Sequence, residues 1–376
     1  MIKRILILGA GNAQIDAIRF CKQHGFTVYG CSYTDADRGI PLLDGFRRID
    51  IRDVENVSAY ASAIGADAVY SVGSDLAMPT AAAVSERLSL PRFISSETAR
   101  ICQNKEKFRR FLGPDFEGNL PYKKARSLDD ALFFDAFPGI MKPVDSQGQR
   151  GVCTVRSREE IEAQFARSRS FSASGTVILE QLVDGPEVSV NVYRQDGRTV
   201  FLLISARGVF GEYPGGIIKE HLLPHGLSKA GEQRVRDLAE RVCAKLKIND
   251  GPAYLQIKLD RVREQPYLIE VTPRLDGCHL WRLIRHCCGV DLLETSFLHL
   301  LDGACSSFQP RPAFDAYRLR FLCEQPGRVF DRARYDVSGA EYLEWYYETG
   351  DTVRPLNGFM EKCGYVIEPV HPGENE

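Results

Sequence analysis

The chain has 376 residues, of which 44% are hydrophobic and 26% charged, and its formal net charge at pH 7 is −2. This composition excludes a disordered or collagen-like chain, and the near-neutral charge argues against a surface that binds nucleic acid or anionic membranes. The length predicts two or three compact domains. The opening apolar run, at residues 4–8, is too short for a signal peptide or a membrane span, and we expect a cytoplasmic protein.

The eleven cysteines are scattered, with no disulfide framework and no CxxC pair. This distribution indicates reduced thiols. A zinc site around His286, Cys287 and Cys288 is an alternative, but the usual spacing of zinc ligands is absent. A partly buried helix accounts for these three residues more simply.

The first 95 residues alternate short apolar strands with helical stretches, in units of about 25–30 residues. We expect strands at 4–8, 26–32, 67–73 and 92–95, and helices at 14–25, 54–65 and 77–90. This alternation is typical of a parallel, doubly wound α/β sheet.

The pattern changes after residue 96, where helices are interspersed with antiparallel strand pairs. We expect helices at 96–113, 157–170, 229–247, 278–289 and 292–303, and strands at 138–144, 153–157, 176–183, 187–208 and 253–275. The segment 187–208 is predicted to be a hairpin that turns at Asp196 and Gly197. Residues 306–376 are predicted to form a small strand-rich extension.

Two glycine-rich loops are candidates for binding phosphate. The first contains Gly9 and Gly11, lies between a strand and a helix, and is followed by Asp35 at the end of the next strand. This arrangement suits a dinucleotide, whose pyrophosphate binds a helix N-terminus and whose ribose binds an acid. However, the third glycine of that pattern is replaced by Gln14, whose side chain would hinder close packing. An NAD-dependent oxidoreductase is therefore an alternative hypothesis, and a simple strand–helix turn is another.

The second loop, at residues 145–151, lies between two predicted strands and directly follows Lys142. Its glycines, Gly148 and Gly151, would let backbone N–H groups approach phosphate oxygens, and the lysine adds a mobile positive charge. Surface hairpins often contain two glycines, so the loop alone is weak evidence. A second lysine upstream, Lys105, and an acidic pattern downstream strengthen it.

The acidic pattern occupies residues 180–187, 256–260 and 270–274. The period of two along a strand predicts that Glu270, Thr272 and Arg274 point to one face. A carboxylate and a guanidinium on one face suit a metal-bridged phosphate beside an anionic substrate. A cross-strand salt bridge on a solvated face is the alternative.

Taken in order, these residues resemble the ATP-grasp ligases over nearly the whole chain. The closest resemblance is to the carboxylate–amine ligase branch, which is similar to L-amino-acid ligases, D-aspartate-type ligases and carbamoyl-phosphate synthase. It implies a mixed α/β and α+β fold with a Rossmann-like pre-ATP-grasp domain at 1–95, an ATP-grasp domain at 96–305 and a small C-terminal domain at 306–376. The ATP-grasp domain would comprise a nucleotide-clamping subdomain at about 96–183 and a catalytic subdomain at about 184–305.

The resemblance implies two phosphate-binding elements. Lys105 and Lys142 would neutralise the nucleotide phosphates. The loop 145–151, with Ser146, Gly148 and Gly151, would close over the γ-phosphate.

It also implies that a short hinge binds the rest of the nucleotide. Glu180, Gln181 and Val183 would read adenine through side chain and backbone, and Glu187 would bind the ribose.

The magnesium and catalytic positions follow from the same resemblance. Glu270, Gln256 and Thr272 match the metal positions, although Thr272 stands where the family usually has asparagine and Gln256 is neutral. Arg274 matches the arginine that steadies the acyl-phosphate, and Lys142 is counted with the catalytic residues.

The implied reaction joins a small-molecule carboxylate to an amine, using ATP and one or two Mg²⁺ ions, through an acyl-phosphate. The segment 205–226, with Arg207, Lys219 and His221, would either cover the acceptor substrate or be an exposed connection. We include Lys219 among the candidate catalytic residues and assign no catalytic role to His221. A non-catalytic nucleotide-binding protein is a further alternative. No nucleic-acid or membrane partner is expected, and the apolar strands of the N-terminal domain would permit a homodimer.

Overall fold

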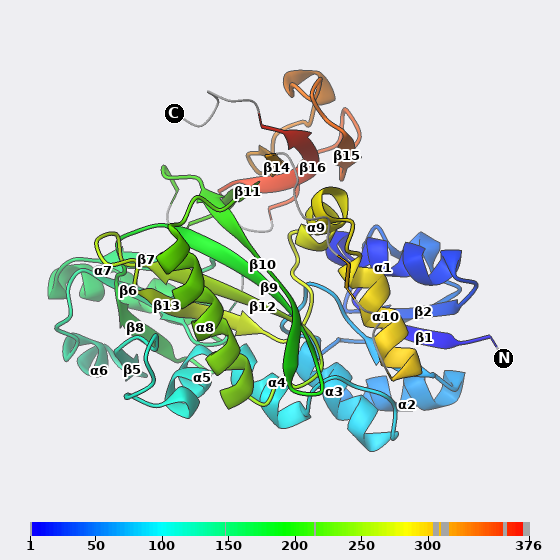
Figure 1. Cartoon of the computed structure of the whole chain (residues 1–376), viewed down its shortest axis with the longest axis horizontal. Coiled ribbons are helices and arrows are strands. Elements are labelled where there is room, and N and C mark those ends of the chain that lie inside the picture. Colours follow the sequence, from blue (N-terminus) through cyan, green and yellow to red (C-terminus); the bar gives the residue numbers. More distant parts are fainter. Residues whose placement is uncertain are drawn as a thin grey trace.

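The computed structural model describes residues 2–146, 148–213, 216–303, 308–309, 316–355 and 359–370. It contains three β-sheets with helices packed against them (Figure 1). Within the described residues, no helix is long and apolar enough to cross a membrane.

The N-terminal sheet is parallel and has the strand order β3-β2-β1-β4. Its elements are β1 (Arg4–Leu8), α1 (Asn12–Gln23), β2 (Thr27–Ser32), the 3₁₀ turn η1 (Ile40–Leu42), β3 (Gly45–Arg48), α2 (Val54–Ile64), β4 (Ala68–Tyr70) and α3 (Met78–Arg87). Because helices cover both faces of the sheet, β1 is a continuous apolar run that is fully buried from Ile5 to Leu8. The predicted doubly wound α/β arrangement is confirmed.

Three details of this region differ from the prediction. Residues 92–95 are not a strand, and the short strand β3 was not predicted. The region predicted as one helix at 96–113 is two helices, α4 (Ser96–Gln103) and α5 (Lys105–Leu112). The break lies at Asn104, which has extended backbone angles and whose side chain accepts a hydrogen bond from the backbone N–H of Lys107. Asparagine competes with the helical backbone in this way and therefore caps a new helix.

The second sheet is small, antiparallel and ordered β5-β8-β6-β7. Its elements are β5 (Tyr122–Ala125), α6 (Leu128–Leu132), β6 (Gly139–Pro143), β7 (Cys153–Val155), α7 (Arg158–Ser170) and β8 (Val177–Gln181). The strands β6 and β7 flank the second glycine loop as an antiparallel hairpin, as predicted.

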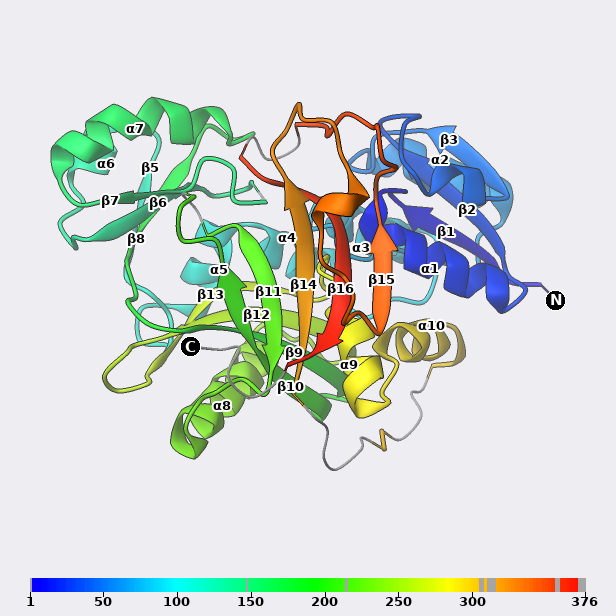
Figure 2. The same cartoon turned by 90° about the horizontal axis from the view of Figure 1, so that it is seen from above.

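The third sheet has eight strands in the order β13-β12-β9-β10-β11-β14-β16-β15, all antiparallel (Figure 2). Its strands are β9 (Glu187–Gln195), β10 (Arg198–Val209), β11 (Ile218–Leu223), β12 (Gly251–Leu259), β13 (Pro266–Thr272), β14 (Tyr317–Glu324), β15 (Tyr342–Trp345) and β16 (Glu361–Pro369). The helices that accompany it are α8 (Lys229–Lys245), α9 (Leu280–Cys288) and α10 (Leu292–Asp302), with the 3₁₀ turn η2 (Arg332–Arg334). The predicted turn at Asp196 and Gly197 joins β9 to β10, and both residues have positive φ.

The predicted strand-rich C-terminal extension is part of this large sheet. Strand β14 pairs with β11, so β14, β16 and β15 continue the sheet toward α1 (Figure 2). One apolar core joins α1, α9, α10 and the C-terminal strands, with Ile18, Leu283, Phe297 and Ile367 among its buried members. The division into three domains stays a prediction.

The large sheet has two chemically different faces. On β9, Val188, Val190 and Val192 belong to the apolar core that also contains buried side chains of α8. The alternate residues of the strand point the other way. Residues directly opposite one another on paired strands share a face, so the register places the following residues together on what we call the polar face: Glu187, Ser189, Asn191, Ser205, Arg207, His221, Tyr254, Gln256, Glu270 and Thr272.

Candidate active site

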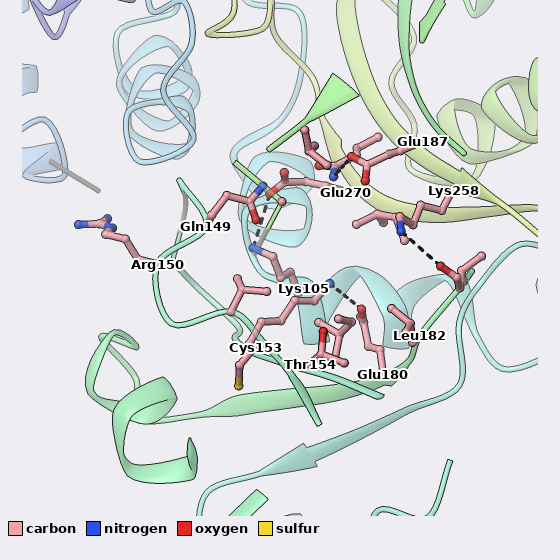
Figure 3. Close-up of a pocket in the computed structure, with 18 of the residues that line it drawn as sticks. Lys105, Gln149, Arg150, Cys153, Thr154, Glu180, Leu182, Glu187, Lys258 and Glu270 are labelled. Carbon is pink, nitrogen blue, oxygen red and sulfur yellow. Dashed lines mark hydrogen bonds and ion pairs between the residues drawn. The ribbon is translucent and has the colours of Figure 1, made fainter. Parts of the chain in front are cut away.

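A cavity of about 710 Å³ lies between the small sheet and the polar face of the large sheet (Figure 3). Its volume is in the range of sites that bind small molecules and cofactors. It is lined by residues of the second glycine loop, of β6 to β8 and of the segment after β8 on one side, and of β12 and β13 on the other. The cavity is surrounded by charged side chains, namely Lys105, Glu180, Glu187, Lys258 and Glu270 (Figure 3).

A buried charge network anchors Lys142 at one wall of this cavity. The Lys142 Nζ lies 2.5 Å from Glu180 Oε2, and Arg109 Nε donates to Glu180 Oε1 at 2.8 Å. Glu180 is only 1% exposed and Arg109 is fully buried. Burial alone would raise the pKa of Glu180, but Arg109 and Lys142 outweigh it and hold that pKa at about 2. Glu180 is therefore ionised and fixes the position of Lys142, whose own pKa is lowered by burial.

Lys105 approaches the cavity from the start of α5. Its Nζ donates to the backbone oxygen of Ser146 at 3.0 Å and lies 3.5 Å from Glu270 Oε1. Burial opposes ionisation of Glu270, but Lys105 and Arg274 outweigh it and hold the pKa of Glu270 below its usual range. Two lysines on different elements therefore face one cavity, where they suit a polyanion such as a triphosphate.

The segment between β8 and β9 forms the next part of the wall. Gln181 and Val183 line the cavity, and Lys258 Nζ donates to the backbone oxygen of Val183 at 3.3 Å. Glu187 Oε1 accepts a hydrogen bond from Arg207 Nη1 at 2.7 Å and another from Gln256 Nε2. Gly185 lies between Val183 and Glu187 in the chain. A Cβ added at Gly185 would come 2.0 Å from the backbone oxygen of Leu259.

The predicted magnesium positions are only partly together in this cavity. Glu270 and Gln256 line it, whereas Thr272 is 1% exposed and its hydroxyl has no hydrogen-bond partner among the described residues. Nowhere in the described residues do three or more His, Cys, Asp or Glu side chains gather as a metal site. One carboxylate and one amide oxygen still fit Mg²⁺, which commonly takes one or two carboxylates and completes its shell with substrate phosphates and water.

Arg274 lies outside the cavity lining, just beyond β13. Its guanidinium donates from Nε to Asp75 Oδ1 at 2.8 Å, makes a second bond to Asp75 through Nη2, and donates from Nη1 to the backbone oxygen of Leu275 at 2.9 Å. Burial raises the pKa of Asp75 in spite of the arginine. Asp75 belongs to the loop after β4, so this contact joins the N-terminal sheet to the end of β13.

The remaining predicted site residues lie at different distances from this centre. Ser146 and Gly148 line the cavity, whereas Gly151 is absent from its lining and packs against Phe171. Gln147, which falls within the predicted lid, lies outside the described residues. The structure does not bring Lys219 to the cavity lining; its side chain, at the start of β11, is 48% exposed and its Nζ is 4.0 Å from Glu220.

The first glycine loop is filled by the chain's own side chain. Gln14 Oε1 accepts a hydrogen bond from the backbone N–H of Gly11 at 3.0 Å, and its amide nitrogen donates to the backbone oxygen of Val72. A Cβ at Gly9 would meet Gln14 Oε1 at 3.2 Å. The N–H that a pyrophosphate would use at this helix start is therefore already satisfied, which argues against dinucleotide binding here.

Among the described residues, no cysteine belongs to a cluster of side chains that could hold a metal ion. The cysteines in the described part of the chain are free thiols. Cys287 and Cys288 are buried on α9, and the neighbouring His286 donates from Nε2 to Glu341 Oε2 at 2.7 Å.

One contributor to the site, Arg109, was missed by sequence reasoning. It lies one helical turn after Lys105 on α5, and this i, i+4 spacing is the signal that would have placed it near the same site. Arg207, which the sequence placed in a segment that would cover the acceptor substrate or form an exposed connection, lies on the polar face of the large sheet.

Comparison with known proteins adds three kinds of similarity. Residues 135–280 match the ATP-grasp domain family. Carnosine synthase 1 of Mus musculus is 24% identical over 356 residues, which cover 85% of this chain and 42% of that enzyme, so the chain spans less than half of this relative. Formate-dependent phosphoribosylglycinamide formyltransferase of Yersinia pestis (strain Pestoides F) is 25% identical over 284 residues, 72% of this chain and 69% of that enzyme.

Solved structures share the fold over almost the whole chain. L-amino acid ligase from Bacillus licheniformis has a TM-score of 0.80 at 19% identity, covering 99% of this chain and 94% of its own. The ADP complex of an N5-carboxyaminoimidazole ribonucleotide synthetase has a TM-score of 0.76 at 16% identity, covering 98% and 93%. The predicted fold class and the predicted resemblance are confirmed.

Proposed function

We propose that the protein is an ATP-dependent ligase that joins a small-molecule carboxylate to an amine through an acyl-phosphate, since residues 135–280 match the ATP-grasp domain family. The observation that carries this proposal is the convergence of Lys105, Lys142 and Glu270 on one cavity between two sheets. The carboxylate–amine ligases that the sequence resembles, and the L-amino acid ligase that shares its fold, support this reaction class.

The nucleotide would occupy the cavity with its base between the two sheets. The backbone of Val183 would read the adenine edge, and Lys258, bonded to the carbonyl oxygen of that residue, keeps the segment in place. Glu187 would receive the ribose hydroxyls. Lys105 and Lys142 would then face the phosphates, where their charges offset the repulsion that builds up between a triphosphate and a second anion.

Glu270 and the amide oxygen of Gln256 would hold magnesium between them and the phosphate oxygens. When bound, the ion supplies positive charge that stabilises the transferring phosphoryl group. Lys105 lies 3.5 Å from Glu270 and would keep that carboxylate aimed at the phosphates.

In the proposed reaction the substrate carboxylate attacks the γ-phosphorus and ADP leaves. An amine then attacks the acyl carbon, and phosphate leaves as the amide forms. Arg274 would hold the carboxylate in line and neutralise the tetrahedral intermediate, exchanging Asp75 for the substrate. The loop 145–151 would close to exclude water, which otherwise hydrolyses the acyl-phosphate.

The alternatives make different predictions about ligands. A non-catalytic nucleotide-binding protein is the second candidate, because Glu270 is the one carboxylate among the three predicted metal positions. An NAD-dependent oxidoreductase is disfavoured by Gln14, which fills the first glycine loop.

A thermal-shift comparison of Mg-ATP, Mg-ADP and NAD with wild type and Lys142→Met tests the proposal. A ligand at a hundredfold excess over its dissociation constant stabilises the folded state by about 2.7 kcal/mol. We expect stabilisation by both adenosine nucleotides and its loss in Lys142→Met, together with ADP release that requires an added carboxylate. Stabilisation by NAD alone would contradict the proposal, and nucleotide binding without carboxylate-dependent ADP release would favour the non-catalytic alternative.

A further inference from the structure

The polar face of the large sheet carries buried polar atoms that have no hydrogen-bond partner in the described part of the chain. They are Asn191 Nδ2, Ser205 Oγ, Arg207 Nε, both ring nitrogens of His221, and Thr272 Oγ1. A buried polar atom without a partner costs about 1–3 kcal/mol, so such atoms are rare in folded proteins. Their concentration on neighbouring strands of one face points to partners that a ligand supplies.

These atoms lie directly beside the cavity already described. Arg207 Nη1 and Gln256 Nε2 both donate to the same oxygen of Glu187. Glu187 and Gln256 line the nucleotide cavity, whereas Arg207 and His221 stand opposite each other one and two strands further along the sheet. The polar face therefore borders the cavity at Glu187 and Gln256 and extends from there across β10 and β11, away from β13 and Glu270.

The charge at this end of the face is positive. Lys362, at the start of β16, places its Nζ 3.7 Å from the ring centroid of Phe321 and 3.4 Å from Cys278 Sγ. Within the described residues it has no carboxylate in ion-pair distance, in contrast to Arg207, which is paired with Glu187 at 2.7 Å.

The strand that carries His221, β11, lies between these two cations. Arg207 is directly opposite His221 on β10, and Lys362 covers Phe321, two residues along β14 from Leu319, which is opposite His221. The side chain of His221 is 0% accessible to solvent, and neither of its ring nitrogens has a hydrogen-bond partner among the described residues. Burial, together with Arg207 and Lys362, lowers the pKa of His221 well below its usual range. A neutral histidine beside two cations offers one N–H donor to a group that brings negative charge with it.

We propose that Arg207, His221 and Lys362 form a subsite for an oxyanion group, a carboxylate or a phosphate, carried by the amine substrate. The oxyanion would accept hydrogen bonds from Arg207 Nε and from the ring N–H of His221, and would pair with the Lys362 ammonium. The inference rests on the proposed function and narrows it, because it makes the acceptor an acidic amine, such as an amino acid or a phosphorylated amine.

The subsite also explains a contrast between two positive charges. The guanidinium of Arg274 donates to Asp75 at 2.8 Å, in a contact that a reacting carboxylate can exchange. Among the described residues, the ammonium of Lys362 contacts a thiol and an aromatic ring but no carboxylate. Two anionic groups can thus be held at separate places, one to react and one to orient the acceptor.

The test uses the full chain saturated with Mg²⁺ and a non-hydrolysable ATP analogue, with ¹⁵N-labelled histidine to observe His221 among the seven histidines. Sodium acetate and sodium phosphate are titrated separately to about 100 mM, against sodium chloride of equal ionic strength. We expect a saturable shift of the His221 resonance with at least one of the two anions. The anion that binds more tightly, acetate or phosphate, indicates whether the amine substrate carries a carboxylate or a phosphate.

Lys362→Met should weaken that binding by about tenfold or more, since it removes the unpaired charge. Lys245→Met, an exposed lysine on α8, is the matched control and should leave it unchanged. Absence of any anion-specific shift at His221, or equal binding by Lys362→Met and wild type, would overturn the subsite. The affinity of each protein for the ATP analogue is measured separately, before saturation. Retained nucleotide affinity in every variant leaves the proposed function standing, whereas a wild type that binds no nucleotide is a separate failure of that proposal.

Discussion

Replacing Glu180 with glutamine removes the anion that neutralises two buried cations. Arg109 is fully buried and Lys142 is 5% exposed, and both contact Glu180 directly. The substitution preserves size, so the loss is electrostatic. Removing one partner of a buried ion pair typically destabilises a protein by about 3–5 kcal/mol, because the remaining charge stays buried without compensation.

The pKa of Glu180 gives an independent magnitude and a pH window. A pKa of about 2 in the folded protein, against 4.5 in the unfolded chain, corresponds to about 3 kcal/mol of stability. Because the folded pKa is lowered, this stability is fully present above pH 4.5 and is lost as the pH falls toward 2. Near pH 3, between the two pKa values, about half of it should remain.

Urea unfolding of wild type and Glu180→Gln at pH 7 and at pH 3 measures both quantities. Glu117→Gln is the matched control, since its carboxylate is 66% exposed and pairs with Arg241 at the surface, where an ion pair contributes about 0–1 kcal/mol. We expect a cost of about 3–5 kcal/mol for Glu180→Gln at pH 7 that becomes smaller at pH 3. Equal costs for the two variants at pH 7, or a difference that does not shrink in acid, would refute the reasoning.

Three further substitutions test other parts of the structure. Gly185→Ala should lower both the melting temperature and nucleotide affinity, because its Cβ would come 2.0 Å from a backbone oxygen of β12; Gly339→Ala, which meets nothing within 4 Å, should change neither. Gln14→Ala should destabilise the protein by about 1–3 kcal/mol, because it leaves the part-buried N–H of Gly11 and the buried carbonyl oxygen of Val72 without their partner. It should not confer NAD-induced stabilisation, and such stabilisation would contradict the role we give to this side chain. Arg274→Ala should abolish amide formation while nucleotide affinity stays within about threefold of wild type, and lost nucleotide binding in isothermal titration would count against its assignment to the acyl-phosphate.

The N-terminal sheet was predictable because its signals are local. In the sequence, a buried strand such as β1 is a continuous apolar run. Each helix begins after the short turn that follows a strand. Failures occurred where one side chain decides the outcome. Asn104 ends one helix and caps the next through a single hydrogen bond, and neither the periodicity nor the composition of that stretch reveals it.

Much of the candidate site was also predictable, since Lys105, Lys142, Glu180 and Glu270 occur in an order that resembles a known family. Their convergence depends on the pairing of distant strands, which the sequence does not specify. The addition of β14 to β11 is of this kind, because it unites residues about 100 positions apart. The partner Arg109 was missed for the same reason, since it neutralises Glu180, which lies 71 positions away in the chain.

The central claim, that ATP activates a carboxylate as an acyl-phosphate, is tested most directly by oxygen transfer. A panel of carboxylates labelled with ¹⁸O in the carboxyl group is incubated with enzyme, Mg-ATP and an amine, and the released phosphate is analysed by mass spectrometry. The account predicts that one ¹⁸O atom moves from the reacting carboxylate into phosphate in step with ADP formation, and that Lys142→Met abolishes it. Amide and ADP formation with unlabelled phosphate would contradict the acyl-phosphate mechanism.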